Sequence, residues 1–274
     1  MVESIKIGNR TFEIGSRTYV MGILNVTPDS FSDGSKYNDM DAALKRVETM
    51  AEEGVDIIDI GGESTRPNHI KISAEEEISR VVPYVKEIKK RFDIPLSLDT
   101  YKGEVAKEVI PYGVDLINDI WGLKYDGMMA SVIAKSGIAC CLMHNRKDAG
   151  YADLVNDVIA DLRESLDIAI KSGIKKEKII TDPGIGFAKT LGQNLMITNN
   201  MERLLELDVP YLLGASRKSM IGLTLDLPID EREEGTLATS VIAAMKGASF
   251  VRVHDVKKSK RAIAMTEAII KSGN

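Results

Sequence analysis

The chain has 274 residues, of which 44% are hydrophobic, and its formal net charge at pH 7 is −5. The acidic balance argues against nucleic acid as the main partner. No stretch approaches the roughly 18 apolar residues of a membrane span, and the first residues lack the apolar segment of a signal peptide, so we expect no membrane partner.

The first predicted element is a β-hairpin, because the stretch IKIGNRTFEI alternates apolar and polar residues around Gly8-Asn9. After it, short β-branched runs alternate with amphipathic helical patterns. Strands are expected at 19–26, 55–62, 95–100, 115–120, 137–144, 178–185, 211–216 and 249–256. Helices are expected at 41–53, 74–91, 102–111, 126–136, 151–172, 193–207, 235–247 and 257–271. Ser73 predicts a cap for the second helix, and Pro83 predicts a kink or break inside it.

This alternation predicts one (β/α)₈ TIM barrel spanning residues 1–274, with the N-terminal hairpin closing its bottom. A doubly wound open sheet is the alternative fold, but no GxGxxG motif follows the first strand. Cys140 and Cys141 are adjacent in an apolar run, so they cannot form an ordinary disulfide with each other. Buried thiols of this kind are typical of a cytoplasmic protein.

Nearly every predicted strand ends at a polar or ionisable residue. TIM barrels carry their active sites at the C-terminal ends of the strands. A single such residue has an ordinary explanation, such as Asp99 capping a helix, but eight in series predict an active site. The strand ends carry Asn25, Gly61-Gly62-Glu63, Asp99, Asn118-Asp119, His144, Asp182, Ser216-Arg217-Lys218 and Arg252-His254-Asp255.

The residue types at these ends divide into two groups. Asp99, Asn118 and Asp182 are rich in acceptors, which suits a nitrogen heterocycle that presents several N–H donors. Lys218, Arg252 and His254 are cationic or can become so, which suits a phosphate or pyrophosphate. Phosphate sites in barrels commonly form after the last two strands, where this second group falls.

Two connections on the same face are long: residues 26–37 and residues 61–73. Long barrel loops are often plain insertions, and length alone leaves that explanation open. Both loops leave neighbouring strands at the functional end, however, and both contain groups able to close over a ligand. We expect them to act as lids that exclude water from a reactive intermediate.

Seven motifs connect these strand ends to a known family. In chain order they are MGILNVTPDSFSDGSKY, DIIDIGGESTRP, PLSLDT, LINDI, TDPGIGFAKT, LLGASRKSMIG and VRVHDV. Together they resemble the dihydropteroate synthase family, in order and at the family's spacing. The resemblance implies a transferase of folate synthesis that joins p-aminobenzoate to 6-hydroxymethyl-7,8-dihydropterin pyrophosphate. Its products would be 7,8-dihydropteroate and pyrophosphate, its metal Mg²⁺, and its inhibitors sulfonamides that compete with p-aminobenzoate.

The resemblance also assigns residues. It implies a pterin pocket of Asp99, Asn118, Met143, Asp182, Phe187, Gly214 and Lys218. It implies a pyrophosphate site of Asn25, Arg252 and His254, with Asn25 also near the metal. Thr65, Arg66, Pro67 and Ser216 would line the p-aminobenzoate side, and Phe31 and Asp33 would act from the first loop. Asp99, Arg252, His254 and Lys218 would be catalytic, and the last helices would form a homodimer.

We expect a dissociative substitution in which pyrophosphate leaves first and the aromatic amine then attacks the pterin cation. Two other readings stay open: a corrinoid-type pterin-binding methyltransferase and a non-catalytic pterin-binding barrel. The chain departs from the family at one place, because MHNR stands where many members read MHMxG. The roles of Asn145 and Arg146 are therefore open.

Overall fold

The structure is a computed structural model that describes residues 2–26, 36–64 and 71–273, with the side chains of residues 36–38 excepted. The predicted loop residues Phe31, Asp33, Thr65, Arg66 and Pro67 lie outside the described residues. Their assignment to the site stays a prediction.

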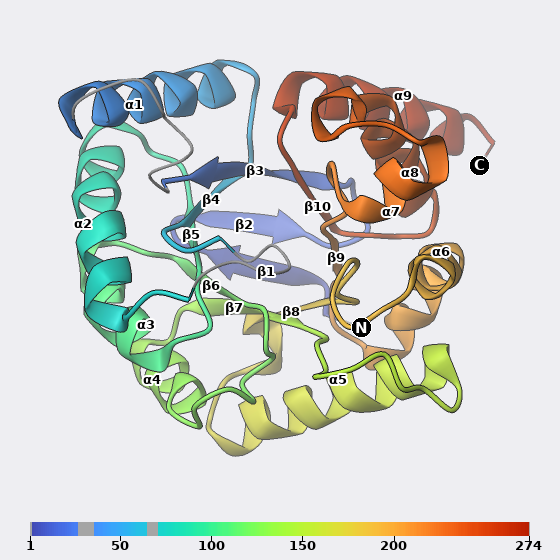
Figure 1. Cartoon of the computed structure of the whole chain (residues 1–274), viewed down its shortest axis with the longest axis horizontal. Helices are drawn as coiled ribbons and strands as arrows, with labels where there is room; N and C mark the ends of the chain where they lie inside the picture. Colours follow the sequence, from blue (N-terminus) through green and yellow to red (C-terminus); the bar gives the residue numbers. More distant parts are fainter. Residues whose placement is uncertain (1, 27–35, 65–70, 274) are drawn as a thin grey trace.

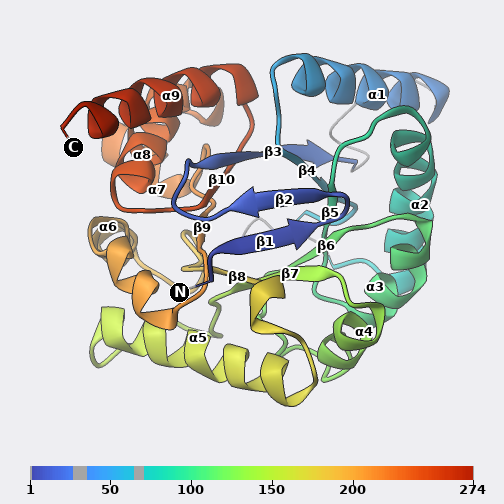
Figure 2. The ribbon, with the colours of Figure 1, turned by 180° about the vertical axis from the view of Figure 1, so that it is seen from behind.

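The predicted hairpin is confirmed. Strands β1 (Ser4–Ile7) and β2 (Arg10–Glu13) pair antiparallel, with Ile7 opposite Arg10 across the Gly8-Asn9 turn. Seen from behind the molecule, the hairpin lies across one end of the barrel (Figure 2).

Eight parallel strands form the barrel and helices surround it (Figure 1). The strand order is β8-β7-β6-β5-β4-β3-β10-β9, and a parallel bridge between Thr181 and Tyr211 joins the two ends. The prediction of a TIM barrel is therefore confirmed. The strands are β3 (Tyr19–Asn25), β4 (Ile57–Gly61), β5 (Leu96–Asp99), β6 (Leu116–Asp119), β7 (Ala139–Met143), β8 (Ile179–Asp182), β9 (Leu212–Leu213) and β10 (Phe250–Val253).

Apart from shifts of up to five residues at their ends, the helices follow the prediction with three differences. They are α1 (Lys36–Glu52), α2 (Ala74–Arg91), α3 (Gly103–Val109), α4 (Met129–Ser136), α5 (Leu154–Lys171), α6 (Leu191–Asn199), α7 (Ser219–Leu225), α8 (Glu233–Met245) and α9 (Val256–Ser272). The predicted break at Pro83 is wrong, because α2 continues through this residue. Val81 and Val85, on either side of it, are buried against the core. The helix predicted at 193–207 ends at Asn199, and a 3₁₀ segment covers Met201–Leu207. Helix α7 was not predicted.

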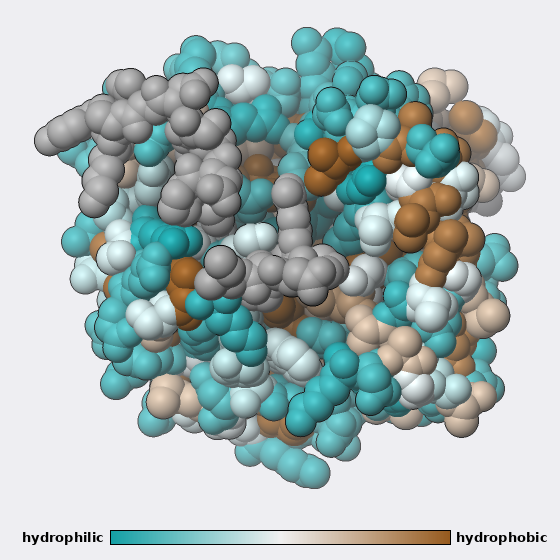
Figure 3. Space-filling model, viewed as in Figure 1, coloured by the Kyte–Doolittle hydropathy of each residue, from teal (hydrophilic) through white to brown (hydrophobic). Residues whose placement is uncertain are grey.

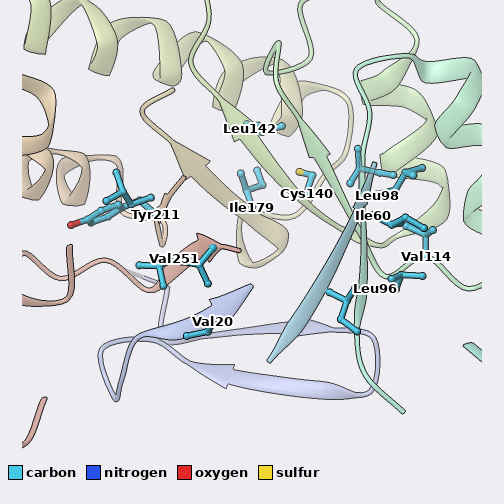
Figure 4. Packing of buried hydrophobic residues seen from close by; sticks show 14 of the residues in the cluster. Val20, Ile60, Leu96, Leu98, Val114, Cys140, Leu142, Ile179, Tyr211 and Val251 are labelled. Carbon is cyan, nitrogen blue, oxygen red and sulfur yellow. The ribbon is translucent and has the colours of Figure 1, made fainter. Parts of the chain in front are cut away.

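Two apolar layers hold the barrel together. Outward-facing residues such as Val20, Ile60 and Cys140 pack against the helices (Figure 4). The inward-facing layer includes Met21, Ile57, Leu116, Cys141, Ile180 and Phe250, and it packs against Ile5, Ile7 and Phe12 of the hairpin. The hairpin therefore closes the N-terminal end of the barrel, as predicted, and seals an apolar floor. In the part of the chain described, every helix is too short or too polar to traverse a lipid bilayer.

Candidate active site

A polar layer lies directly above the apolar floor. Side chains two positions apart on a strand point to the same side, so the residue two after each floor residue also faces the barrel interior. Ile57 is followed by Asp59, Leu116 by Asn118, Ile180 by Asp182 and Phe250 by Arg252. Three of these polar residues are at most 4% exposed, and the side chain of Arg252 is 17% exposed. The barrel thus holds polar and charged groups directly above a floor of apolar side chains.

Arg252 lies between two carboxylates. Its Nε donates to Oδ2 of Asp59 at 2.5 Å, and its Nη2 donates to Oδ2 of Asp99 at 2.7 Å. Asp59 also accepts from Nδ2 of Asn118 at 3.3 Å and from the hydroxyl of Ser97 at 2.5 Å. Asp59 was missed from the sequence because it lies inside a strand; its signal is an acidic residue within the apolar run VDIIDIGG.

Asp99 keeps one oxygen available inside the barrel. Among the residues described, Oδ1 of Asp99 is buried and has no hydrogen-bond partner. Burial raises the pKa of Asp99 to about 7; the neighbouring Asp59 adds to this rise, while the guanidinium of Arg252 opposes it. Asp99 is not a helix cap, since the residue before α3 is Lys102. Its free oxygen can therefore accept an N–H from a ligand.

Asp182 and Lys218 both lie close to Gly214. A Cβ built at Gly214 would lie 3.4 Å from Oδ2 of Asp182 and 3.8 Å from Nζ of Lys218, so a side chain at this position would lie against both groups. Oδ1 of Asp182 accepts from the backbone N–H of Gly184 at 2.7 Å. Burial lowers the pKa of Lys218 to about 8 and raises the pKa of Asp182. Near Gly214, Asp182 therefore offers a ligand an acceptor and Lys218 offers it a donor.

A family model described as "Pterin binding enzyme" matches residues 21–254. A dihydropteroate synthase from Clostridium beijerinckii is 59% identical over 268 residues, which cover 97% of this chain and 100% of the relative. The chain belongs to the dihydropteroate synthase family. A dihydropteroate synthase from Clostridium difficile, solved in the presence of pteroic acid, has a TM-score of 0.92 and 47% identity over 94% of this chain and 98% of its own. The Xanthomonas albilineans enzyme with 4-aminobenzoic acid has a TM-score of 0.93 and 38% identity over 98% of each chain.

The dihydropteroate synthase pocket assigned to Met143 and Phe187 has an apolar wall in this structure. Met143 packs in a small cluster with Tyr101 and Ile120, and Trp121 and Phe187 lie against it. The ring of Phe187 also lies 4.8 Å from the ammonium of Lys218. Tyr101 and Trp121 were not predicted, because they follow the strand ends within ordinary-looking connections.

Two of the three residues that the dihydropteroate synthase resemblance assigns to pyrophosphate lie at the rim, whereas the third, Arg252, lies in the polar layer between Asp59 and Asp99. Asn25 ends β3 opposite Gly61 of β4, and His254 directly follows β10. Nδ1 of His254 is 2.9 Å from the hydroxyl of Ser216, which also accepts from the backbone N–H of His254 at 3.2 Å. Ser216 and His254 therefore lie together, although the resemblance assigns them to different substrates.

Three of the polar residues at or just after strand ends make contacts that stabilise the fold. Asp119 accepts from the backbone N–H groups of Trp121 and Leu123 at 2.9 and 2.7 Å and so fixes the turn after β6. Arg217 pairs with Glu233 of α8 at 3.3 Å. His144 turns away from the pocket, toward α5, where Nε2 lies 2.9 Å from Oδ2 of Asp161.

Proposed function

We propose that this chain condenses 6-hydroxymethyl-7,8-dihydropterin pyrophosphate with p-aminobenzoate, giving 7,8-dihydropteroate and pyrophosphate. The observation that carries the proposal is the buried polar layer above the barrel floor, in which acceptors and cations lie together. The substrates are small molecules, in line with the pteroic acid and 4-aminobenzoic acid present in the two related structures.

The pterin is proposed to lie among Asp99, Asn118, Asp182 and Lys218. Its amino and ring N–H groups form an amidine-like edge, and a carboxylate accepts two parallel N–H bonds from such an edge. Asp182 offers that carboxylate, and Asp99 offers its unpartnered Oδ1. Lys218 supplies an N–H donor to a ring acceptor, and the apolar wall at Met143 covers one face of the ring.

Arg252, His254 and Asn25 are proposed to bind the pyrophosphate. A leaving diphosphate gains negative charge, and a fixed guanidinium stabilises that charge where it develops. The amide oxygen of Asn25 is a hard donor of the kind that Mg²⁺ prefers, and Mg²⁺ is commonly held by few protein groups together with substrate phosphates. Within the described ranges, no group of three or more His, Cys, Asp or Glu side chains is placed to hold a metal ion. When bound, Mg²⁺ supplies additional positive charge to the leaving group.

The reaction is proposed to be dissociative. The C–O bond to pyrophosphate breaks first, and the electron-rich ring carries the resulting positive charge on its exocyclic methylene. Asp99 stabilises this cation from within the barrel, and the amine of p-aminobenzoate then attacks the methylene carbon and loses a proton. An aromatic amine has an available lone pair at neutral pH, so the nucleophile needs little help from a base. No covalent bond to the protein is required.

The deciding experiment measures pyrophosphate release with and without p-aminobenzoate and Mg²⁺. We expect release that depends on the amine and yields 7,8-dihydropteroate in equal amount. Release that ignores the amine, or no release, would overturn the proposed function. For the mechanism, a pterin–protein adduct trapped during normal turnover would exclude the non-covalent pathway.

We further propose that the chain forms a homodimer through α7, α8 and α9. These helices carry large apolar side chains on the surface, among them Leu223 and Met245, each 66% exposed, and Figure 3 shows apolar surface on the side of α7 and α8. A Met245→Glu substitution is expected to shift the sedimenting species from dimer to monomer, and a monomeric wild-type protein would contradict this. A cytoplasmic location stays a prediction, supported by the two buried free thiols Cys140 and Cys141.

A further inference from the structure

The loop between β8 and α6 shapes the pocket around Lys218. Nζ of Lys218 donates to the carbonyl of Ile185 at 2.5 Å, and the ring of Phe187 lies 4.8 Å from the same nitrogen. The side-chain stem of Lys218 also passes close to Gly186, since a Cβ built there would lie 3.3 Å from Cδ. The shape of this loop therefore sets where the Lys218 ammonium lies.

One residue of this loop has a strained backbone conformation. Three of its residues have left-handed backbone: Gly184 (φ +71°), Gly186 (φ +84°) and Ala188 (φ +45°). For a residue with a Cβ, such as Ala188, this conformation costs about 1–2 kcal/mol. Strained backbone persists only where the surrounding contacts hold it. A brace that holds Ala188 and its neighbours is therefore expected.

Lys189 is such a brace. Its Nζ lies 3.1 Å from the carbonyl of Gly184, 3.1 Å from the carbonyl of Phe187 and 2.9 Å from Nδ1 of His144. Burial lowers the pKa of Lys189 to about 7. In its protonated form the amine has three N–H donors, and each has an acceptor here. The Asp161 carboxylate accepts at Nε2 of His144, so the Nε2–H tautomer leaves Nδ1 as an acceptor for Lys189.

The remaining contacts close a ring that returns to the loop. Nε of Arg146 donates to Asp161 at 2.5 Å, and the Arg146 guanidinium lies over the ring of Tyr151 at 4.6 Å. The Tyr151 hydroxyl in turn donates to the carbonyl of Ala188 at 2.9 Å. The role that the sequence left open for Arg146 is thus a structural link in this ring.

We propose that Lys189 is a positioning residue for pterin binding: it fixes the loop between β8 and α6 and, through it, Phe187 and the ammonium of Lys218. This inference rests on the proposed function. Lys189 has no direct place among the residues expected to touch the substrates, so its loss should weaken pterin binding and leave the p-aminobenzoate side unchanged.

The test compares Lys189→Met with Lys178→Met. Lys178 lies at the opposite end of β8, and its Nζ also donates to a backbone carbonyl, that of Lys6, at 2.9 Å. Lys189→Met is expected to raise the KM for the dihydropterin pyrophosphate, and the Kd of the probe 6-hydroxymethylpterin, about tenfold or more, because small misplacements of a binding group are costly. The KM for p-aminobenzoate should stay within about twofold in both variants, and Lys178→Met should leave all three constants unchanged.

A general loss of folded protein would lower kcat and leave both KM values unchanged. A rise in the KM for the pterin substrate alone therefore identifies a positioning role for Lys189. If Lys189→Met does not fold, Tyr151→Phe removes the bond to Ala188 from the far side of the ring and should raise the same two pterin constants by a smaller factor. Wild-type pterin constants in these variants would overturn the positioning role. A wild-type protein that neither binds pterin nor turns over would instead overturn the proposed function.

Discussion

Lowering the pH should destabilise this protein through His144. The imidazole side chain is fully buried, and burial lowers its pKa from 6.5 to about 4, although the Asp161 carboxylate opposes this shift. In the unfolded chain His144 takes up a proton near pH 6.5, whereas in the folded chain it does so only near pH 4. The unfolded state therefore binds more protons between these values, and stability falls as the pH falls through this window.

The size of this loss of stability follows from the pKa shift of His144. One pKa unit corresponds to about 1.4 kcal/mol, so lowering the pH from 7 to 4 should cost about 3 kcal/mol through this one group. Asp99 and Asp119 act in the opposite direction, because burial raises the pKa of each to about 7 and acid then favours their folded forms. The pH profile of the wild type alone is therefore not diagnostic, and the difference from a variant without the imidazole is needed.

The assay is urea unfolding at pH values from 7 to 4 for the wild type and for His144→Gln. Glutamine does not titrate, so the variant should lose about 3 kcal/mol less than the wild type over this range, whatever its stability at pH 7. Parallel pH profiles for the two proteins would refute the reasoning, since they would show that His144 binds its proton equally in both states.

Three substitutions test other parts of the site. Asp59→Ala should destabilise the protein by about 3–5 kcal/mol in urea unfolding, because it leaves the buried Arg252 with one carboxylate partner in place of two; a loss below about 1 kcal/mol would contradict this. Gly184→Ala places a Cβ 2.0 Å from the carbonyl oxygen of His144 and should lower the thermal midpoint by several degrees. Gly214→Val fills the space beside Asp182 and should weaken 6-hydroxymethylpterin binding at least about tenfold in a fluorescence titration, with an unchanged Kd as the contrary result.

The sequence predicted the barrel well because each βα unit repeats the same two signals, a β-branched run and an apolar helical face. It predicted less well which side chains face the barrel interior. Met143 ends β7 and His144 directly follows it in extended chain, so only one of them can face the interior, and the sequence does not say which. Asp59 was missed because it lies inside β4 rather than at its end, where Arg252 contacts it within the barrel. Helix α7 is only seven residues long, too short for a periodic pattern to reveal.

The charge balance of the polar layer bears on the proposed mechanism. Among the described residues, this layer contains Asp59, Asp99 and Asp182 together with the cations Lys218 and Arg252, so it carries one negative charge in excess when all five groups are ionised. Burial raises the pKa values of Asp99 and Asp182. Such a layer gains little from a neutral pterin, but it stabilises a ring that becomes positive as pyrophosphate leaves toward the rim. Interactions stronger in the transition state than in the ground state raise kcat rather than lower KM. Asp99→Asn should therefore reduce kcat far more than it changes the KM for the pterin substrate, and near-full turnover with bound pterin would exclude this electrostatic role.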